Sequence, residues 1–462
     1  MYRRSMPSAT TRWIAHLSKI LQPRSSYFDL APLRILNPII LEEGILLFYL
    51  VQNQLGAALL DKHDETTLLW RTTNPLWQTH EKIHPIKMIY KQRTVVFHYY
   101  FKKNYSVELE LPQLFNTQIQ IQGVVLERAA DNPILRANPR HSWEASAVFN
   151  AGALYLDNKV HFIYRAITDL GESVFGYAAS TDGVHINERS HEPVYYHTHA
   201  ERYPQEEKQA YCSGPSGHGC EDPRLIRLDD SIYMTYTAFD GTHAPCVALT
   251  YIDIDNFLKK QWHWKKPIQL SQQQETHKNW VIFPEKINGQ YAILHSLTPK
   301  ISIHYLDTLT HDDLFIQSHY HAEPALQNTD WDNWIRGVGP PPIKTQEGWL
   351  ILYHAMEHRD PNKYKIGAML LALHDPTQVL YRSAYPILEP YVYYENQGHK
   401  AGVVYACGAV VIAETLLVYY GAADTVLCAA AVNLERLLCS IKKSQPPITQ
   451  SLLCKHKHAQ PC

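Results

Sequence analysis

The chain has 462 residues, a formal net charge of −2, and 45% hydrophobic and 11% aromatic residues. This length can bury a large core and is compatible with two or three domains or with one large β-domain. The nearly neutral charge leaves no electrostatic footprint for nucleic acid or an acidic membrane, so neither is an expected partner, and a neutral or small polar ligand fits better.

The cysteines and the apolar segments indicate the compartment. Eight cysteines are present without a Cys-x-x-Cys pair or regular spacing, and no secretory signal precedes them, so reduced thiols in a cytoplasmic protein are expected. The most apolar run, 407–420, contains Glu414 and is shorter than the roughly 20 residues of a spanning helix. No clustered metal-ligand set and no nucleotide-binding glycine loop is present, so no metal and no cofactor is expected.

Strands are expected along most of the chain. Residues 1–28 carry arginines and serines and are predicted to be a flexible or helical leader. From about residue 29 onward, short runs with period-two alternation are separated by polar turns, as at 160–165, 231–236 and 349–354, and such runs predict strands. Long amphipathic helices are scarce, so the fold class predicted is all-β.

Recurring turn and strand phrases predict the domain organisation. Four-strand units that repeat at this scale are typical of a β-propeller, because one unit cannot bury its faces without neighbours. Residues 29–128 are predicted to form an N-terminal β module resembling a degenerate blade, residues 129–442 the main β-domain, and residues 443–462 a C-terminal tail. The two Asn-Pro pairs within 129–140 predict the linker into the main domain.

One internal repeat is visible directly. Residues 44–50 parallel 348–354, and residues 55–71 parallel 366–382, so the two segments are predicted to be copies of one blade. His354 stands opposite Leu50 in this comparison. The early copy is therefore interpreted as structural, without a polar site.

The hexapeptide Gly-Cys-Glu-Asp-Pro-Arg at 219–224 is the main candidate for chemistry. Adjacent acids on a rigid turn, here Glu221 and Asp222, can serve as a proton donor and as an acceptor for a sugar hydroxyl. Arg224 can hold a carboxylate or an anionic substrate in bidentate fashion. The alternative is a turn with a structural ion pair, because Asp-Pro turns open loops in many proteins.

An ordered set of segments between about residues 132 and 440 resembles glycoside hydrolase family 130. These segments are 143–144, 148–150, 164–166, 180–183, 219–224, 282–289, 336–342, 348–350 and 420–424. The family comprises β-mannoside phosphorylases and some β-mannosidases on a five-bladed β-propeller. The resemblance thus implies that residues 129–442 form a five-bladed catalytic propeller acting on a small mannoside or oligosaccharide; a homo-oligomer is compatible with this.

The resemblance also implies roles for individual residues. Asp222 would be the general acid, with its pKa raised by burial or by Glu221. The residues expected to bind the sugar are Asn150, Arg165, Glu221, Arg224, His354 and Asp424. Phosphate would replace water as the nucleophile and would need a cationic cradle, for which the resemblance implies Lys278, Asn279, Arg336 and Tyr364.

The chain departs from the family pattern after the strand at 291–294. Phosphorylases of the family usually carry an arginine there, and this chain has His295 and Ser296. The change weakens the phosphate site or moves the arginine's task to His295, Lys300 or Arg336.

Three functions stay open at the level of the sequence. The leading one is phosphorolysis of a β-mannoside with inversion, giving α-mannose 1-phosphate. The second is an inverting β-mannosidase, which needs a second carboxylate roughly 6.5–9.5 Å from the acid, with Glu285 and Glu221 as candidates. The third is a sugar-binding propeller without catalysis.

Overall fold

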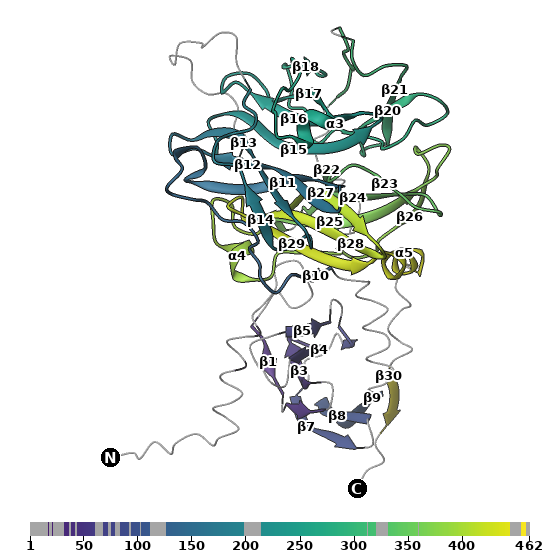
Figure 1. Ribbon diagram of the computed structural model, residues 1–462. Coiled ribbons are helices and arrows are strands. Elements are labelled where there is room, and N and C mark those ends of the chain that lie inside the picture. The colour runs from purple at the N-terminus through teal and green to yellow at the C-terminus, as the bar shows by residue number, and fades with distance from the viewer. Residues whose placement is uncertain are drawn as a thin grey trace. The chain divides into compact units, whose positions relative to one another are not determined.

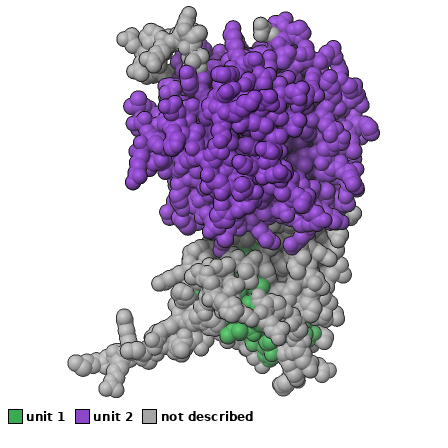
Figure 2. Space-filling model, viewed as in Figure 1, with its two compact units in different colours: residues 1–122, 445–462 green, residues 123–444 purple. Residues whose placement is uncertain are grey.

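The computed structural model is built almost entirely of strands (Figure 1). The residues that it describes are 17, 21, 32–36, 38–41, 44–60, 68–72, 75–78, 84–91, 94–101, 103–110, 126–197, 214–311, 313–319, 331–358, 360–443 and 454–458. The chain divides into two compact units, coloured separately in Figure 2: unit 1 is Met1–Gln122 with Gln445–Cys462, and unit 2 is Gly123–Ser444. Within the described part of the chain, no helix combines the length and the apolar character needed to cross a membrane.

Unit 1 contains two antiparallel sheets. The first has the order β1-β3-β4-β5, with β2 on β3 and β6 on β4; its strands are β1 (Arg34–Ile35), β2 (Ile39–Ile40), β3 (Ile45–Val51), β4 (Gln54–Leu60), β5 (Leu68–Arg71) and β6 (Trp77–Gln78). The second has the order β30-β9-β8-β7, with β7 (His84–Lys91), β8 (Thr94–Phe101), β9 (Lys103–Glu110) and β30 (Cys454–His458). A strand near the C-terminus thus pairs with β9. Of the predicted leader 1–28, only Leu17 and Leu21 lie among the described residues.

Unit 2 contains four sheets, and two of them are short. The sheet β10-β29-β28-β27 consists of β10 (Glu127–Arg128), β27 (Val404–Ile412), β28 (Thr415–Ala422) and β29 (Val426–Asn433). A three-stranded sheet contains β19 (Val281–Ile282), β20 (Tyr291–Ser296) and β21 (Ser302–Leu306). Strand β10 therefore completes a sheet whose other strands come nearly 300 residues later in the chain, since Glu127 pairs with Ala431.

The two larger sheets of unit 2 are mostly antiparallel, with one parallel pairing, between β13 and β15. One contains β11 (Ala147–Leu156), β12 (Lys159–Ile167), β13 (Glu172–Ser180), β14 (Ile186–Arg189), β15 (His218–Leu228), β16 (Ser231–Phe239), β17 (Cys246–Asp253) and β18 (Ile268–Gln269). Another contains β22 (Trp334–Val338), β23 (Ile343–Lys344), β24 (Trp349–Glu357), β25 (Asp360–Leu371) and β26 (Val379–Arg382). The helices among the described residues of unit 2 are a 3-10 turn (Ser142–Glu144), α3 (Ile254–Leu258), α4 (Tyr393–Asn396) and α5 (Leu434–Lys443).

Strand β12 of unit 2 is apolar on both faces because sheets pack against both. On β12, Val160 and Phe162 belong to one apolar cluster with Tyr419 of β28, while Ile163 points to another with Met234 of β16. Successive side chains of a strand face opposite sides, so a strand between two sheets has a nearly continuous apolar run. The prediction of an all-β fold is confirmed.

Candidate active site

Unit 2 encloses a cavity of about 310 Å³ that collects residues far apart in the sequence. The predicted residues that line it are Asn150 on β11, Arg165 on β12, Asp222 on β15, Lys278 and Asn279 before β19, Arg336 on β22, Tyr364 on β25 and Asp424 between β28 and β29. The other lining residues, which the sequence analysis did not single out, are Gly214, Thr276, Lys400, Val403 and Tyr405. Three predicted residues, Glu221, Arg224 and His354, are buried without lining the cavity.

Two β-bulges aim the central polar side chains. The pairing of β15 with β16 shifts register between Glu221 and Arg224, and Asp222 between them has a φ of +55°. The pairing of β11 with β12 shifts in the same way after Phe149, and Asn150 has a φ of +46°. A bulge redirects a side chain out of the normal alternation, and Asn and Asp tolerate positive φ better than other non-glycine residues. The Asn150 amide Nδ2 thereby donates to Asp222 Oδ1 at 2.7 Å.

The hexapeptide at 219–224 differs from its expected conformation. The sequence predicts a turn before a strand, but these residues lie inside β15, which begins at His218. The bulge supplies the local change of direction that a turn would have supplied. Gly421 on β28 leaves room for the Asn150 side chain, because a Cβ atom at position 421 would lie 2.0 Å from Asn150 Oδ1.

Arg165 connects the two acids of the hexapeptide. Its Nη1 lies 3.1 Å from Asp222 Oδ1 and its Nη2 lies 3.0 Å from Glu221 Oε1. The second oxygen of Glu221 accepts a bond from Lys278 Nζ at 3.0 Å. Glu221 is fully buried, so its carboxylate holds two cations of the site in place and does not face the cavity.

Arg224 is buried beneath the cavity lining and bonds mainly to the backbone. Its guanidinium donates to the carbonyl of Asp222 at 2.7 Å, to the carbonyl of Gly339 at 2.8 Å, and to Asn279 Oδ1 at 2.8 Å. A planar fork of donors suits this role, because several acceptors are fixed at once. Arg224 therefore contacts two lining residues, Asp222 and Asn279, and does not itself line the cavity.

His354 is also structural in this arrangement. His354 is expected from the sequence to bind the sugar, but its side chain is fully buried on β24. Its Nε2 accepts a bond from the Ala406 backbone N–H at 2.9 Å, and its ring stacks on Tyr405 with 3.9 Å between centroids. Burial, together with the nearby charge of Arg224, lowers the pKa of His354 to about 3, so the ring is neutral and supports Tyr405 from below.

The two cavity carboxyls have pKa values shifted in opposite directions. Burial acts to raise the pKa of Asp222, but Arg165, Arg224 and Lys278 outweigh it, and the pKa lies below its ordinary value. A raised pKa is expected for this acid from the sequence; the structure differs because these cations surround it. Burial raises the pKa of Asp424 above its ordinary value, against the opposing charges of Lys400 and Arg165.

A second group of polar residues lies around Tyr364. Its hydroxyl accepts a bond from Arg336 Nε at 3.3 Å, and the ammonium of Lys400 lies 4.4 Å from the centroid of its ring. The backbone carbonyl of Arg336 accepts a bond from Asn279 Nδ2 at 3.0 Å, and Tyr405 donates its hydroxyl proton to Asn279 Oδ1. Lys400 and Tyr405 were not predicted from the sequence, because neither belongs to a recognisable motif.

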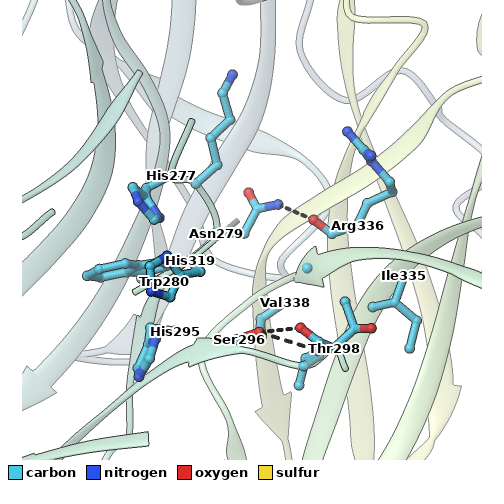
Figure 3. Close-up of a pocket in the computed structure, with 13 residues that line it drawn as sticks. His277, Asn279, Trp280, His295, Ser296, Thr298, His319, Ile335, Arg336 and Val338 are labelled. Atoms are coloured by element: carbon cyan, nitrogen blue, oxygen red, sulfur yellow. Dashed lines mark hydrogen bonds between the residues drawn. The ribbon is translucent and has the colours of Figure 1, made fainter. Parts of the chain in front are cut away.

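A smaller cavity, of about 40 Å³, shares Lys278, Asn279 and Arg336 with the larger one (Figure 3). His295 lines it, and His295 Nδ1 is 2.9 Å from Ser318 Oγ. Burial, with some contribution from His304 and His277, lowers the pKa of His295 to about 4. The ring is therefore neutral at pH 7 and does not supply the positive charge of the arginine expected at this place.

The remaining candidates lie outside the cavity. Glu285 is exposed and pairs with Lys344, and it does not line the cavity. Its proposed role as a base for water activation is therefore not supported by its position. Among the described residues, no three His, Cys, Asp or Glu side chains are grouped so as to hold a metal ion.

Comparison with known proteins identifies the family. The sequence model of glycoside hydrolase family 130, described as beta-1,4-mannooligosaccharide phosphorylase, matches residues 125–443. The chain belongs to this family.

The similar proteins within family 130 include phosphorylases. A 1,2-beta-oligomannan phosphorylase of Thermoanaerobacter sp. (strain X514) is 37% identical over 327 residues, which are 68% of this chain and 98% of that protein. A beta-1,2-mannobiose phosphorylase of the same organism is 34% identical over 325 residues, with the same coverage. The structure of the beta-1,2-mannobiose phosphorylase of Listeria innocua with beta-1,2-mannobiose matches with a TM-score of 0.52 and 27% identity, over 69% of this chain and 99% of that chain.

Proposed function

We propose that this family-130 protein cleaves β-mannosides by phosphorolysis with inversion and releases α-mannose 1-phosphate. The observation that carries the proposal is the single cavity that holds the Asp222 carboxyl together with Lys278, Arg336 and Tyr364. A phosphorylase needs both an acid for the leaving group and cations for the attacking phosphate. The relatives act, by their names, on β-1,2-linked mannosides, and we extend this linkage to the proposal.

The proposed catalytic domain is a five-bladed β-propeller formed by residues 129–442. The long sheet divides naturally at β13 and β15, which pair at only two positions, Glu172 with His218 and Ser173 with Gly219. This division leaves five sheets of three to five strands each, and one of them includes β10 (Glu127–Arg128), which precedes the predicted boundary at residue 129. Apolar clusters join each sheet to the next, and one of them contains Phe162 of β12 with Tyr419 of β28. A closed ring of blades would use these clusters to bury every sheet face.

In the proposed mechanism the mannosyl ring lies against Asn150, Arg165 and Asp424. These groups offer both donors and acceptors to ring hydroxyls. An oxygen of phosphate attacks the anomeric carbon while the bond from that carbon to the leaving oxygen breaks. Asp222 provides the proton that the leaving oxygen takes up, by way of a hydroxyl of the mannose ring as the family resemblance implies.

Phosphate itself helps Asp222 to act as an acid. In the free protein Asp222 is ionised at neutral pH, because the cations around it lower its pKa. A phosphate bound beside Lys278 adds negative charge next to this carboxyl and offsets part of that effect. The pKa of Asp222 therefore rises on binding, and the protonated form that donates to the leaving oxygen becomes easier to reach when the substrates are in place.

Two features favour phosphorolysis over hydrolysis. An inverting hydrolase needs a carboxylate free to activate water, but both oxygens of Glu221 are bonded to cations and Glu285 is at the surface. The cavity also carries Arg336 and Lys400, charges that a neutral water nucleophile does not require.

Five described cysteines are free thiols, which accords with a cytoplasmic enzyme.

Product analysis tests this function. The protein is incubated with β-1,2-mannobiose with and without inorganic phosphate, and mannose 1-phosphate and free mannose are quantified. We expect α-mannose 1-phosphate only when phosphate is present; phosphate-independent release of mannose would show a hydrolase, and no product would indicate a binding protein or another substrate.

Substitution of the acid tests its role. Asp222→Asn should lower the turnover by about 10²- to 10⁴-fold, the usual contribution of general acid catalysis. Asp182→Asn is the control, because Asp182 is exposed and pairs with His185 outside the cavity. Unchanged turnover in Asp222→Asn would remove Asp222 from its proposed role.

A further inference from the structure

The cations around the cavity are not equally engaged by carboxylates. Arg165 pairs with Glu221 and Asp222, and Lys278 pairs with Glu221. Lys400 also lines the cavity, yet among the described residues no carboxylate lies within ion-pair distance of its ammonium. Its ammonium lies 4.4 Å from the centroid of the Tyr364 ring, and its positive charge also opposes the rise in the pKa of Asp424.

Backbone bonds fix the position of Lys400 relative to the cavity. The Lys400 backbone N–H donates to the carbonyl of Ala423 at 3.0 Å, immediately before the cavity residue Asp424. Two residues later, the carbonyl of Gly402 accepts the backbone N–H of Tyr364 at 2.9 Å. The loop that carries Lys400 is thus attached to two lining segments, although the side chain itself stays exposed to solvent.

Tyr364 contacts two positive groups. Arg336 donates to its hydroxyl, and Lys400 lies over its ring face. Two cations that contact the same tyrosine in one cavity provide charged donors for a phosphate group, whose oxygens accept charge-assisted hydrogen bonds. His295, which takes the place of the family arginine, is neutral at pH 7 because burial lowers its pKa to about 4. The phosphate site therefore needs a positive charge from another residue.

We propose that Lys400 is a phosphate-binding residue that holds the attacking phosphate together with Arg336 and Tyr364. This inference rests on the proposed function. It assigns to Lys400 the charge that the missing arginine would carry, from a loop that belongs to a different part of the chain. In the reverse reaction the same ammonium binds the phosphate group of α-mannose 1-phosphate.

Steady-state kinetics of Lys400→Met test the inference. The KM for phosphate should rise about tenfold, which is the effect of losing one hydrogen bond to a charged group. The KM for β-1,2-mannobiose should change less than twofold, and in the direction of synthesis the KM for α-mannose 1-phosphate should rise with that for phosphate. Lys400→Arg keeps the charge and should restore most of the phosphate affinity.

Lys286→Met is the matched control. The ammonium of Lys286 also lies 4.4 Å from the centroid of a tyrosine ring, that of Tyr291, but Lys286 is exposed and does not line the cavity. This variant should keep the wild-type KM for phosphate, which separates loss of a phosphate ligand from loss of a surface lysine packed on a ring.

The outcomes separate the inference from the function on which it rests. If the wild-type protein forms α-mannose 1-phosphate and Lys400→Met leaves the KM for phosphate unchanged, the inference is wrong while the function stands. A rise confined to the KM for the mannoside would also overturn it, because Lys400 would then belong to a sugar subsite. If the wild-type protein releases mannose without phosphate, the proposed function itself fails, and the inference fails with it.

Discussion

In unit 1, Tyr49 of β3 packs its ring against Gly56 of β4, where a Cβ atom would lie 2.4 Å from the ring carbon Cζ. In unit 2, Tyr353 of β24 packs in the same way against Gly367 of β25, with a corresponding distance of 2.5 Å. The two strand pairs therefore share a tyrosine and glycine contact, as the sequence repeat predicts.

The residue after the tyrosine differs between the two regions. Leu50 of unit 1 is buried in an apolar cluster with Phe48. His354 of unit 2 accepts a backbone bond from Ala406 and supports the cavity residue Tyr405. The same pair of strands thus carries an apolar core residue, Leu50, in unit 1 and a buried histidine that contacts the cavity lining, His354, in unit 2.

The electrostatics differ in the same sense. Among the described residues, unit 1 buries no carboxylate, whereas unit 2 buries several, including Glu221, Asp222 and Asp424. Burying a charge destabilises the fold unless a partner compensates it. We infer that the apolar packing of the strands stabilises both units, and that the buried carboxylates of unit 2 lower the stability of the fold while they shape the cavity.

Asp424→Asn should sharpen this comparison with the largest effect. If Asp424 accepts sugar hydroxyls as proposed, its loss should lower kcat/KM by on the order of 10²-fold. The folded protein binds the Asp424 proton more tightly than the unfolded chain, because burial raises the pKa above its ordinary value of 3.8. Stability therefore falls as the pH rises above 3.8, and the asparagine avoids this loss.

Thermal unfolding of the Asp424→Asn variant checks the electrostatic part. Its melting temperature should exceed that of the wild type at pH 7.5, and the difference should be smaller at pH 4.5. A variant that is less stable than the wild type at pH 7.5 would contradict the claim that this carboxylate destabilises the fold.

Exchange of the two differing residues should have an intermediate effect. His354→Leu leaves the buried Ala406 N–H without its acceptor and should lower the free energy of unfolding by about 1–3 kcal/mol. It should also reduce activity, because Tyr405 loses its stacking partner. Leu50→His places a polar ring in an apolar cluster and should destabilise by a similar amount, about 1–3 kcal/mol, with the kinetic constants unchanged.

Chemical denaturation at several pH values distinguishes the two substitutions. The pKa of His354 is about 3 in the folded protein, so the unfolded chain binds the proton first as the pH falls below about 6.5. The stability that the neutral His354 gives the wild type is thus lost as the pH falls from 6.5 towards 3. The difference in free energy of unfolding between the wild type and His354→Leu should therefore become smaller. A gap that widens at low pH would speak against a neutral buried imidazole.

Removal of the two tyrosine hydroxyls, one at a time, should give the smallest difference between the two units in the free energy of unfolding. The Tyr353 hydroxyl donates to Asp332, which also pairs with Arg382 Nη2 at 2.7 Å. The Tyr49 hydroxyl forms longer bonds, both 3.2 Å, with Thr72 Oγ1 and Arg71 Nε.

Tyr353→Phe should therefore cost about 1.5–3 kcal/mol and Tyr49→Phe about 0.5–1.5 kcal/mol. Urea unfolding of both variants measures the two values side by side. Equal losses in free energy of unfolding would show that the hydrogen bond from Tyr353 to the Asp332 carboxylate stabilises unit 2 no more than the Tyr49 bonds stabilise unit 1.

The sequence was sufficient for the strands and for most of the cavity lining. Period-two alternation is a local property, so it predicted the all-β fold, and the ordered motifs led to Asn150, Asp222 and Asp424, which do line the cavity. The bulges at Asn150 and Asp222 could not be predicted, because a register shift depends on the partner strand.

Burial and pairing of charges were the other limits. Glu221, Arg224 and His354 belong to motifs but lie beneath the lining, and a motif does not tell which side of a surface its residues occupy. The pKa of Asp222 depends on Arg165, Arg224 and Lys278, of which two are distant in sequence. Lys400 lies on a loop without a pattern of its own.

Strand β10 has a consequence for anyone who wishes to express the family-130 region alone. Glu127 and Arg128 supply the outer strand beside β29, and Leu126 donates its N–H to the carbonyl of Ile387 at 2.8 Å. A gene fragment that starts after codon 128 would leave the backbone of β29 uncovered, and uncovered edges promote aggregation. The first codon of such a fragment belongs upstream of Leu126.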